Sequence, residues 1–245
     1  MEFFPNKFQF CFFADYSDLK ASSEVIKTLI DVFSDHELLP STYQELAAGK
    51  PVSTRIQMAS AAGGQWVVQF ESNRINIEKN PTDIDLDTLG GIDTFTTEAI
   101  AMLGRVIEHY PKNATRLSLV VTNLSSEIAE GELERVYAKA AKPLRFYEGN
   151  EPFEWGVRAV ARIERTISRV PEELNVVTAL NRIQGTFHSP EKQIDLDRLR
   201  VMSDINTNAG NTDSRFTVLE AREFASAAVD IQRGIHEQLL EMLGE

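Results

Sequence analysis

The pattern of hydrophobic side chains predicts the same order of strands and helices twice along the chain. This repeated order is the feature that most limits which folds the chain can adopt. Residues 7–15 alternate between an aromatic and a polar face, as a half-buried strand does. The first series predicts a strand at 7–15, a helix at 22–35, strands at 52–60, 65–71 and 74–79, and a helix at 96–110. The second predicts a strand at 116–122, a helix at 126–141, strands at 156–170, 174–186 and 198–207, and a helix at 218–243.

Strands that are joined by turns and flanked by helices in this order are typical of the α+β class. We therefore predict antiparallel sheets with packed helices, in two similar strand–helix–three strands–helix halves at 1–112 and 113–245. The halves either remain separate lobes or join into one continuous domain. A further short helix is expected at 41–49, because Ser41-Thr42-Tyr43-Gln44 fits a capping box that Gly49 would close.

A short sequence match is consistent with an internal duplication. Residues 84–89 read IDLDTL, and residues 194–199 read IDLDRL, 110 positions later. A six-residue match also arises by chance, so duplication and coincidence both stay open.

The stretch 156–170 fits two secondary structures. Val160, Ile163 and Ile167 recur at helical spacing, whereas Ala159, Ala161 and Ile163 alternate as in a strand. We favour the strand, because its β-branched residues suit a half-exposed pleat. Pro171-Glu172-Glu173 is then expected to form the turn into the next strand.

Charge and cysteine content narrow the compartment and the partners. The 245 residues include 25 basic and 37 acidic side chains, for a net charge of −12. Because an acidic chain repels phosphate backbones and anionic lipid, we expect neither nucleic acid nor membrane as partner. Cys11 is the only cysteine, which fits a reducing cytoplasm. The first residues do not resemble a signal peptide, and no apolar run reaches the roughly 18 residues of a membrane helix.

Sequence signatures of catalysis and metal binding are not found. The chain has no glycine-rich phosphate loop and no serine elbow, and its four histidines are scattered. Asp204-x-Asn206-x-Asn208 resembles the start of a calcium loop, but Arg215 stands where such a loop needs a glutamate. We interpret the acidic run of Asp83, Asp85, Asp87 and Asp93 as a solvated edge. The sequence predicts no catalytic residue, cofactor or metal site, and an enzyme is the less favoured reading.

Four arginines form a candidate anion patch. If the three strands of the second half pair as a meander, one face could carry Arg158, Arg162, Arg182 and Arg200. Guanidinium groups pair with carboxylate or phosphate in two parallel hydrogen bonds, so the patch would bind a small anion. The alternative is cross-strand pairing with Glu164 and Glu173.

The last predicted helix carries a candidate interface. Its apolar residues recur every three or four positions to the end of the chain, and the distal set is Ile235, Leu239, Met242 and Leu243. These residues either dock on a second copy or partner protein, or pack on the chain's own sheet.

Three stretches carry a resemblance to a known family. They are Gln65-Trp66-Val67-Val68-Gln69-Phe70, Asn73-Arg74-Ile75-Asn76-Ile77 and Asp204-Ile205-Asn206-Thr207, followed by the long last helix. The chain resembles a sporadically distributed family of uncharacterised bacterial proteins of about this length. The resemblance implies a bacterial cytosolic protein without established catalytic residues, and such patchy distribution is associated with defence-type systems. We therefore expect a non-catalytic interaction protein, a homodimer or a subunit, with an anion-binding module or enzyme as the alternative.

Overall fold

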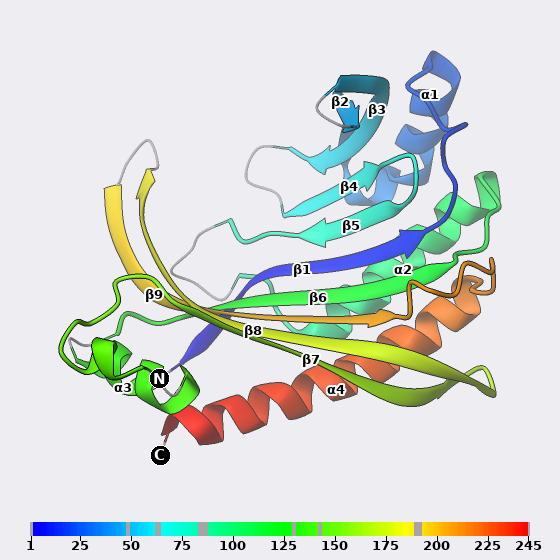
Figure 1. Cartoon of the computed structure of the whole chain (residues 1–245). Coiled ribbons are helices and arrows are strands. Elements are labelled where there is room, and N and C mark those ends of the chain that lie inside the picture. The colour runs from blue at the N-terminus through cyan, green and yellow to red at the C-terminus, as the bar shows by residue number, and fades with distance from the viewer. Residues whose placement is uncertain are drawn as a thin grey trace.

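Within the described residues, nine strands form one antiparallel sheet (Figure 1). The computed structural model describes residues 2–47, 50–61, 65–82, 88–128, 131–141, 144–188 and 193–244. The strand order is β2-β3-β4-β5-β1-β6-β9-β8-β7. The strands are β1 (Phe3–Phe13), β2 (Leu38–Ala47), β3 (Lys50–Ser60), β4 (Trp66–Phe70), β5 (Ile75–Lys79), β6 (Arg116–Ser125), β7 (Gly156–Ile167), β8 (Val170–His188) and β9 (Gln193–Thr207). The helices are α1 (Ser23–Val32), α2 (Ile92–His109), α3 (Glu132–Ala141) and α4 (Val218–Gly244), with short 3-10 turns η1 (Ser34–His36) and η2 (Arg145–Glu148).

The predicted α+β class is confirmed, and the two halves meet in the middle of the sheet. The first half runs β1-α1-β2-β3-β4-β5-α2, and the second runs β6-α3-β7-β8-β9-α4. Their first strands, β1 and β6, pair with each other from Phe3↔Ser125 to Phe13↔Arg116. The sheet is therefore continuous across the predicted boundary at residue 112, and the first half has one strand more than expected.

That additional strand replaces the helix predicted at 41–49, which is wrong. Residues 41–47 belong to β2, which pairs with β3 from Leu38↔Ser60 to Ala47↔Lys50, and residues 48 and 49 lie outside the described residues. This ladder satisfies the backbone groups that a capping box would have served at a helix start. The Tyr43 hydroxyl, which a short exposed helix would leave in water, donates to the carbonyl of Phe70 at 3.2 Å.

The ambiguous stretch at 156–170 is a strand, as we favoured. β7 pairs with β8 without a register shift from Gly156↔Asn181 to Ile167↔Val170. The turn consists of Ser168 and Arg169, both with positive φ (47° and 70°), as a two-residue hairpin of this twist requires. The turn therefore comes before Pro171, which lies inside β8.

Only one copy of the sequence match between the halves lies wholly within the described residues. Residues 194–199 lie inside β9. In the first copy, residues 84–87 lie outside the described residues. The likeness of the halves that the structure shows is the order of their elements.

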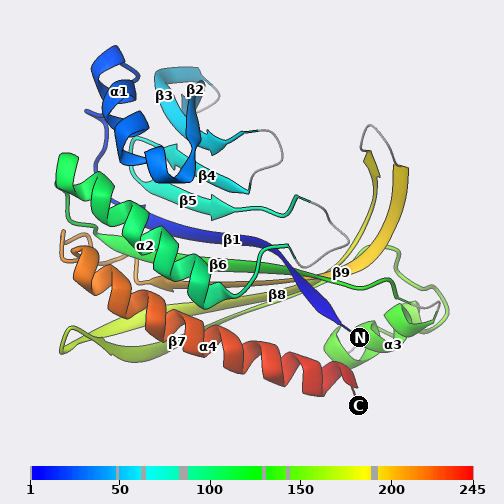
Figure 2. The same ribbon diagram turned by 180° about the vertical axis from the view of Figure 1, so that it is seen from behind.

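Helices cover one face of the sheet, and the main core lies between them. Figure 2 shows α1, α2 and α4 on the same side of the strands. Phe8 and Phe10 of β1 face these helices, where their rings lie 5.3 Å from Phe95 of α2 and 6.3 Å from Phe224 of α4. Each such fully buried side chain contributes roughly 1.5–3 kcal/mol. A second, smaller cluster below α3 comprises Leu133, Val136, Trp155, Leu180, Leu199, Val201 and Leu243.

Candidate functional site

Strand β7 is one edge of the sheet and is exposed on both sides. It pairs only with β8 among the described strands. Of its 12 residues only Ile167 is buried, Val157 and Ile163 are half-buried, and Val160 is 49% exposed. A long, regular edge with apolar residues on it is a ready template for another strand.

The outward backbone groups of β7 belong to its even-numbered residues. The amide of Arg182 donates to the carbonyl of Trp155 at 3.1 Å, so position 155 points its backbone toward β8. Hydrogen-bonded and non-hydrogen-bonded pairs alternate along an antiparallel ladder. The amides and carbonyls of Arg158, Val160 and Arg162 therefore point away from β8.

The opposite edge of the sheet is protected where β7 is not. Strand β2 contains Pro40, and its register shifts between Glu45 and Leu46. Proline and bulges are two of the devices by which edge strands avoid pairing with other chains, and charged side chains are another. Strand β7 has no proline and no bulge but carries charged side chains of both signs, so the two ends of the sheet differ in their capacity to accept a strand.

An apolar groove with a volume of about 390 Å³ runs beside β7. It lies between the strand and the distal half of α4. Three of the four predicted interface residues, Ile235, Leu239 and Met242, line it. The fourth, Leu243, is only 3% exposed and belongs to the second core cluster. The distal helix therefore packs on its own sheet and also presents apolar side chains to the groove.

The sheet register separates the four predicted arginines. Paired residues of neighbouring strands share a face, and the register places Arg158, Arg162 and Arg200 together on the face without helices. Arg182 lies opposite Leu199, whose side chain is in the core, so it belongs to the other face. The expectation of one four-arginine face is thus corrected to three.

The position of the hairpin turn explains the separation. A turn at 171–173 would have placed Arg162 opposite Arg182, whereas the turn at Ser168 and Arg169 shifts the pairing by an odd number of residues. An odd shift moves every side chain of a strand to the other face. Pro171 is tolerated inside β8 because pairing with β9 starts only at Leu174, so its missing amide breaks no bond.

Arg182 is held in an ion-pair network on its own face. Its guanidinium donates to both carboxylate oxygens of Asp197, at 2.9 and 2.7 Å, and to Glu151 at 3.1 Å. The hydrogen bond from Arg182 lowers the pKa of Asp197 below its usual value. These contacts satisfy the side chain within the chain itself.

The three arginines on the helix-free face differ in their partners. Arg162 lies 3.5 Å from Glu173, which is the cross-strand pairing that we weighed as the alternative. The side chains of Arg158 and Arg200 form no ion pair or hydrogen bond with any described residue. Asn181, between them in the register, leans over Gly156 so closely that a Cβ there would collide with it.

Cys11 lies on the helix-free face in the middle of the sheet. It is 4% exposed, and burial raises the pKa of its thiol to about 12. A thiol with this pKa stays protonated at neutral pH and is a poor nucleophile.

The side chains of the calcium-like segment at 204–208 form hydrogen bonds with other groups of the chain. Asp204 accepts from Ser118 at 2.7 Å and from Asn206 at 3.0 Å. Asn208 accepts from the amide of Gly210, which closes a turn. Arg215 pairs with Glu172 at 2.6 Å. Of the acidic run, Asp83, Asp85 and Asp87 lie outside the described residues.

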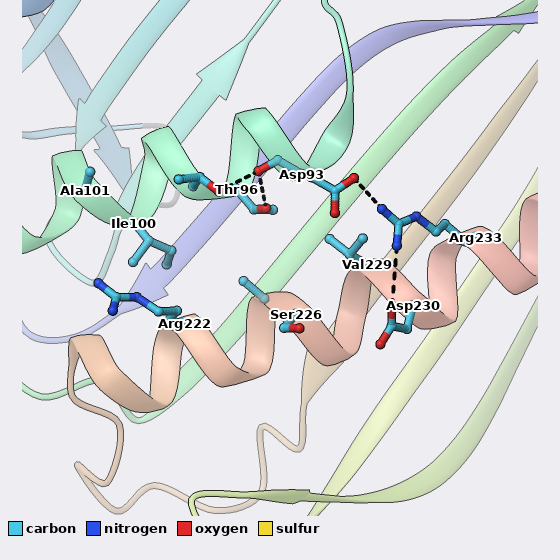
Figure 3. A pocket seen from close by; sticks show the side chains of 11 residues that line it. Asp93, Thr96, Ile100, Ala101, Arg222, Ser226, Val229, Asp230 and Arg233 are labelled. Atoms are coloured by element: carbon cyan, nitrogen blue, oxygen red, sulfur yellow. Dashed lines mark hydrogen bonds and ion pairs between the residues drawn. The ribbon is translucent and has the colours of Figure 1, made fainter.

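Asp93, the described member of that run, lies in a groove of about 380 Å³ between α2 and α4 (Figure 3). It forms an ion pair with Arg233, which also lies 3.5 Å from Asp230. Among the described residues, no group of three or more His, Cys, Asp or Glu is placed to hold a metal ion. No helix within the described residues is long and apolar enough to span a membrane.

Comparison with known proteins adds nothing to the site. No family model matches the chain, and no curated protein matches it. Sequence reasoning missed the feature that stands out in the structure, the open edge of β7. The residue pattern of a strand does not show which other strands pair with it.

Proposed function

We propose that this chain is a non-catalytic interaction protein that self-associates through β7. The observation that carries the proposal is the regular, exposed edge of this strand, with hydrogen-bonding groups directed outward. The occupant is a second copy of the chain, because the charges along the edge complement themselves. A place in a bacterial accessory or defence-type system rests on the sequence resemblance and belongs to the same proposal.

The charge order selects how two copies of β7 would pair. Centred on Ala161, an antiparallel pair sets Arg158 opposite Glu164 of the second copy, twice by symmetry. It also places even-numbered residues opposite each other, as the outward backbone groups require. Centring on Val160 would instead set Arg158 opposite Arg162. Opposite charges facing across strands contribute about 0.2–1 kcal/mol per pair, and like charges oppose pairing.

The helices leave room for this arrangement. The helix-side face of β7 is exposed at Ala159 and Ala161, although α3 and α4 contact other parts of the strand. A two-fold axis at the paired edge runs perpendicular to the sheet and puts both helical layers on the same side. The apolar grooves of the two copies then lie next to each other, with Leu239 and Met242 of each facing the shared space.

A cysteine crosslink tests the pairing and its register. In the proposed dimer Ala161 faces Ala161 of the second copy in a non-hydrogen-bonded pair, where Cβ atoms lie roughly 4.5–5.5 Å apart. The Ala161→Cys variant should form a disulfide-linked dimer under mild oxidation, and wild type should not, because Cys11 is buried. Crosslinking of Ile163→Cys in place of Ala161→Cys would contradict this register, and monomeric wild type at high concentration in light scattering would contradict self-association.

A charge-reversal pair separates pairing from folding. In the Arg158→Glu variant, a glutamate at position 158 would face Glu164 of the second copy at each end of the paired strands. This repulsion should weaken association at least tenfold. Adding Glu164→Arg restores opposite charges and should recover the dimer. Both side chains are exposed, so the melting temperature of the monomer should stay constant. A double variant that is as weak as Arg158→Glu would overturn the proposed contact.

A second candidate function, anion binding on the helix-free face, is favoured by Arg200. Its guanidinium has no partner among the described residues and lies beside Asn181 in the register. Nucleotides and phosphosugars should stabilise the protein in a thermal-shift assay, and Arg200→Gln should remove the shift. Arg165→Gln, on an exposed residue of the opposite face, is the matched control. Equal shifts in both variants would exclude this site.

A further inference from the structure

A cavity of about 340 Å³ lies on the helix side of the sheet, away from β7. It is bordered by residues of β1, β6, the start of α2 and the middle of α4. Its volume is at the lower end of the range for small-ligand sites. The lining residues are Phe3, Pro5, Phe8, Gly90, Gly91, Ile92, Val121, Asn123, Gln232 and His236.

Helix α2 starts at this cavity without a capping side chain. Its N-cap is Gly91, with φ −77° and ψ 146°, and no side chain accepts from the first amides there. Asp93 in the first turn is directed to Arg233 in the neighbouring groove (Figure 3). An uncapped start of an 18-residue helix offers amide donors and the positive end of the helix dipole to an anion.

Two buried amide side chains line the same cavity without partners. Asn123 is 5% and Gln232 is 8% exposed, and neither side chain forms a hydrogen bond with any described residue. The Nδ1 atom of His236 is also buried without a partner. The amide atoms of Asn123 and Gln232 are not among the fully buried unpartnered atoms, so they are open to the cavity and available to a ligand. A fully buried polar atom without a partner, such as Nδ1 of His236, calls for an explanation such as a bound water or ion. These side chains are an observation independent of the helix start.

The lining defines the chemistry of the ligand. The amides and the helix start supply donors for a negatively charged group, and Phe3, Phe8 and Val121 supply an apolar wall. Of the described residues that line the cavity, none is Lys or Arg, so a singly charged group fits better than a phosphate dianion. We propose that this cavity binds a small monocarboxylate with an aromatic or branched aliphatic body, its carboxylate at the start of α2.

The Gly91→Asp variant tests the position of the carboxylate. The backbone angles of Gly91 suit an aspartate cap, and a Cβ there meets no atom within 4 Å. The new side chain should cap α2 itself and exclude the ligand. We expect phenylacetate to bind wild type in calorimetry and protein-observed NMR, phenylacetamide not to bind, and Gly91→Asp to weaken phenylacetate at least tenfold while its melting temperature stays the same or rises.

The Gln232→Met variant separates recognition from a structural role. Because the Gln232 amide has no partner among the described residues, an apolar side chain of similar size should not lower the melting temperature. The same change should weaken phenylacetate binding at least tenfold. Glu237→Met, at an exposed position of α4 that lines neither this cavity nor the groove beside β7, is the control and should change neither.

Three outcomes would overturn the proposal. They are no binding of phenylacetate, benzoate or 3-methylbutyrate at millimolar concentration, equal binding to Gly91→Asp and wild type, and tighter binding of inorganic phosphate than of the carboxylates. None of these results depends on self-association through β7, since the cavity and the strand lie in different parts of the molecule and the variants leave β7 intact.

Discussion

At the scale of single residues, Glu45 joins two parts of the sheet. Its carboxylate accepts from Arg55 at 2.7 Å and from the amide and hydroxyl of Ser72 at 3.0 and 2.6 Å. The Arg55 side chain is 3% exposed and also donates to two carbonyls in the segment after β1. Burial raises the pKa of Glu45, but the hydrogen bonds from Ser72 and Arg55 outweigh it and lower the pKa to about 2.

Replacing Glu45 should therefore change both stability and its dependence on pH. The folded-state pKa lies below the unfolded value near 4.5, so this carboxylate stabilises the fold above pH 4.5 and loses that effect as the pH falls toward 2. Glu45→Gln should lower the free energy of unfolding by roughly 3 kcal/mol at pH 7, because it leaves Arg55 buried without its charge partner. Urea titrations at several pH values should show that the free energy of unfolding falls less steeply below pH 4.5 in the variant than in wild type.

The matched control for this residue is an exposed ion pair. Glu173 lies 3.5 Å from Arg162, with both side chains well exposed. Glu173→Gln should change the free energy of unfolding by less than about 0.5 kcal/mol. An equal loss in both variants would show that the buried network has no special role.

At the scale of elements, the strand pattern predicted most elements but not their register. Alternating residues were sufficient to place β1 in the chain, because one buried face leaves its period in the sequence. The stretch that forms β7 is exposed on both faces and fitted a helix as well as a strand. The capping-box motif at Ser41 was wrong, because pairing with β3 overrides local preference. Arg182 was assigned to the wrong face, because the register depends on which two residues make the turn.

The turn itself offers a test at this scale. Arg169 has φ 70°, a conformation that costs side chains with a Cβ roughly 1–2 kcal/mol. Arg169→Gly should raise the free energy of unfolding by about 0.5–1 kcal/mol after the added freedom of the unfolded chain is counted. Arg169→Ala keeps the Cβ and should bring no such gain. Chemical denaturation of both variants separates backbone conformation from loss of the side chain.

The end of α4 combines core and surface residues that sequence periodicity could not distinguish. Leu243 is 3% exposed and Met242 is 37% exposed, although both belong to the predicted interface. Leu243→Ala should lower the free energy of unfolding by about 2–4 kcal/mol, whereas Met242→Ala should cost less than about 1 kcal/mol. Thermal denaturation of the two variants would reveal the difference, and equal losses would contradict this packing.

At the scale of the whole molecule, the candidate sites depend on how the halves combine. The helix-free face and the uncovered β7 exist because α2 and α4 pack side by side on one side of a shared sheet (Figure 2). No pattern within either half shows that β1 and β6 become neighbours, since that pairing joins segments more than a hundred residues apart. The sequence could therefore suggest two halves but could not decide between separate lobes and the single sheet that places the sites.

The shared sheet predicts that neither half folds alone. In the first half, β1 would lose its pairing with β6, and Phe10 would lose the cover of Phe224 on α4. In the second half, β6 would lose its pairing with β1. Fragments 1–112 and 113–245, produced separately, should lack cooperative unfolding and dispersed NMR spectra, because each exposes a strand ladder and part of the core. Mixed or co-expressed fragments should recover both properties, whereas a cooperative transition in either isolated fragment would contradict the single shared core.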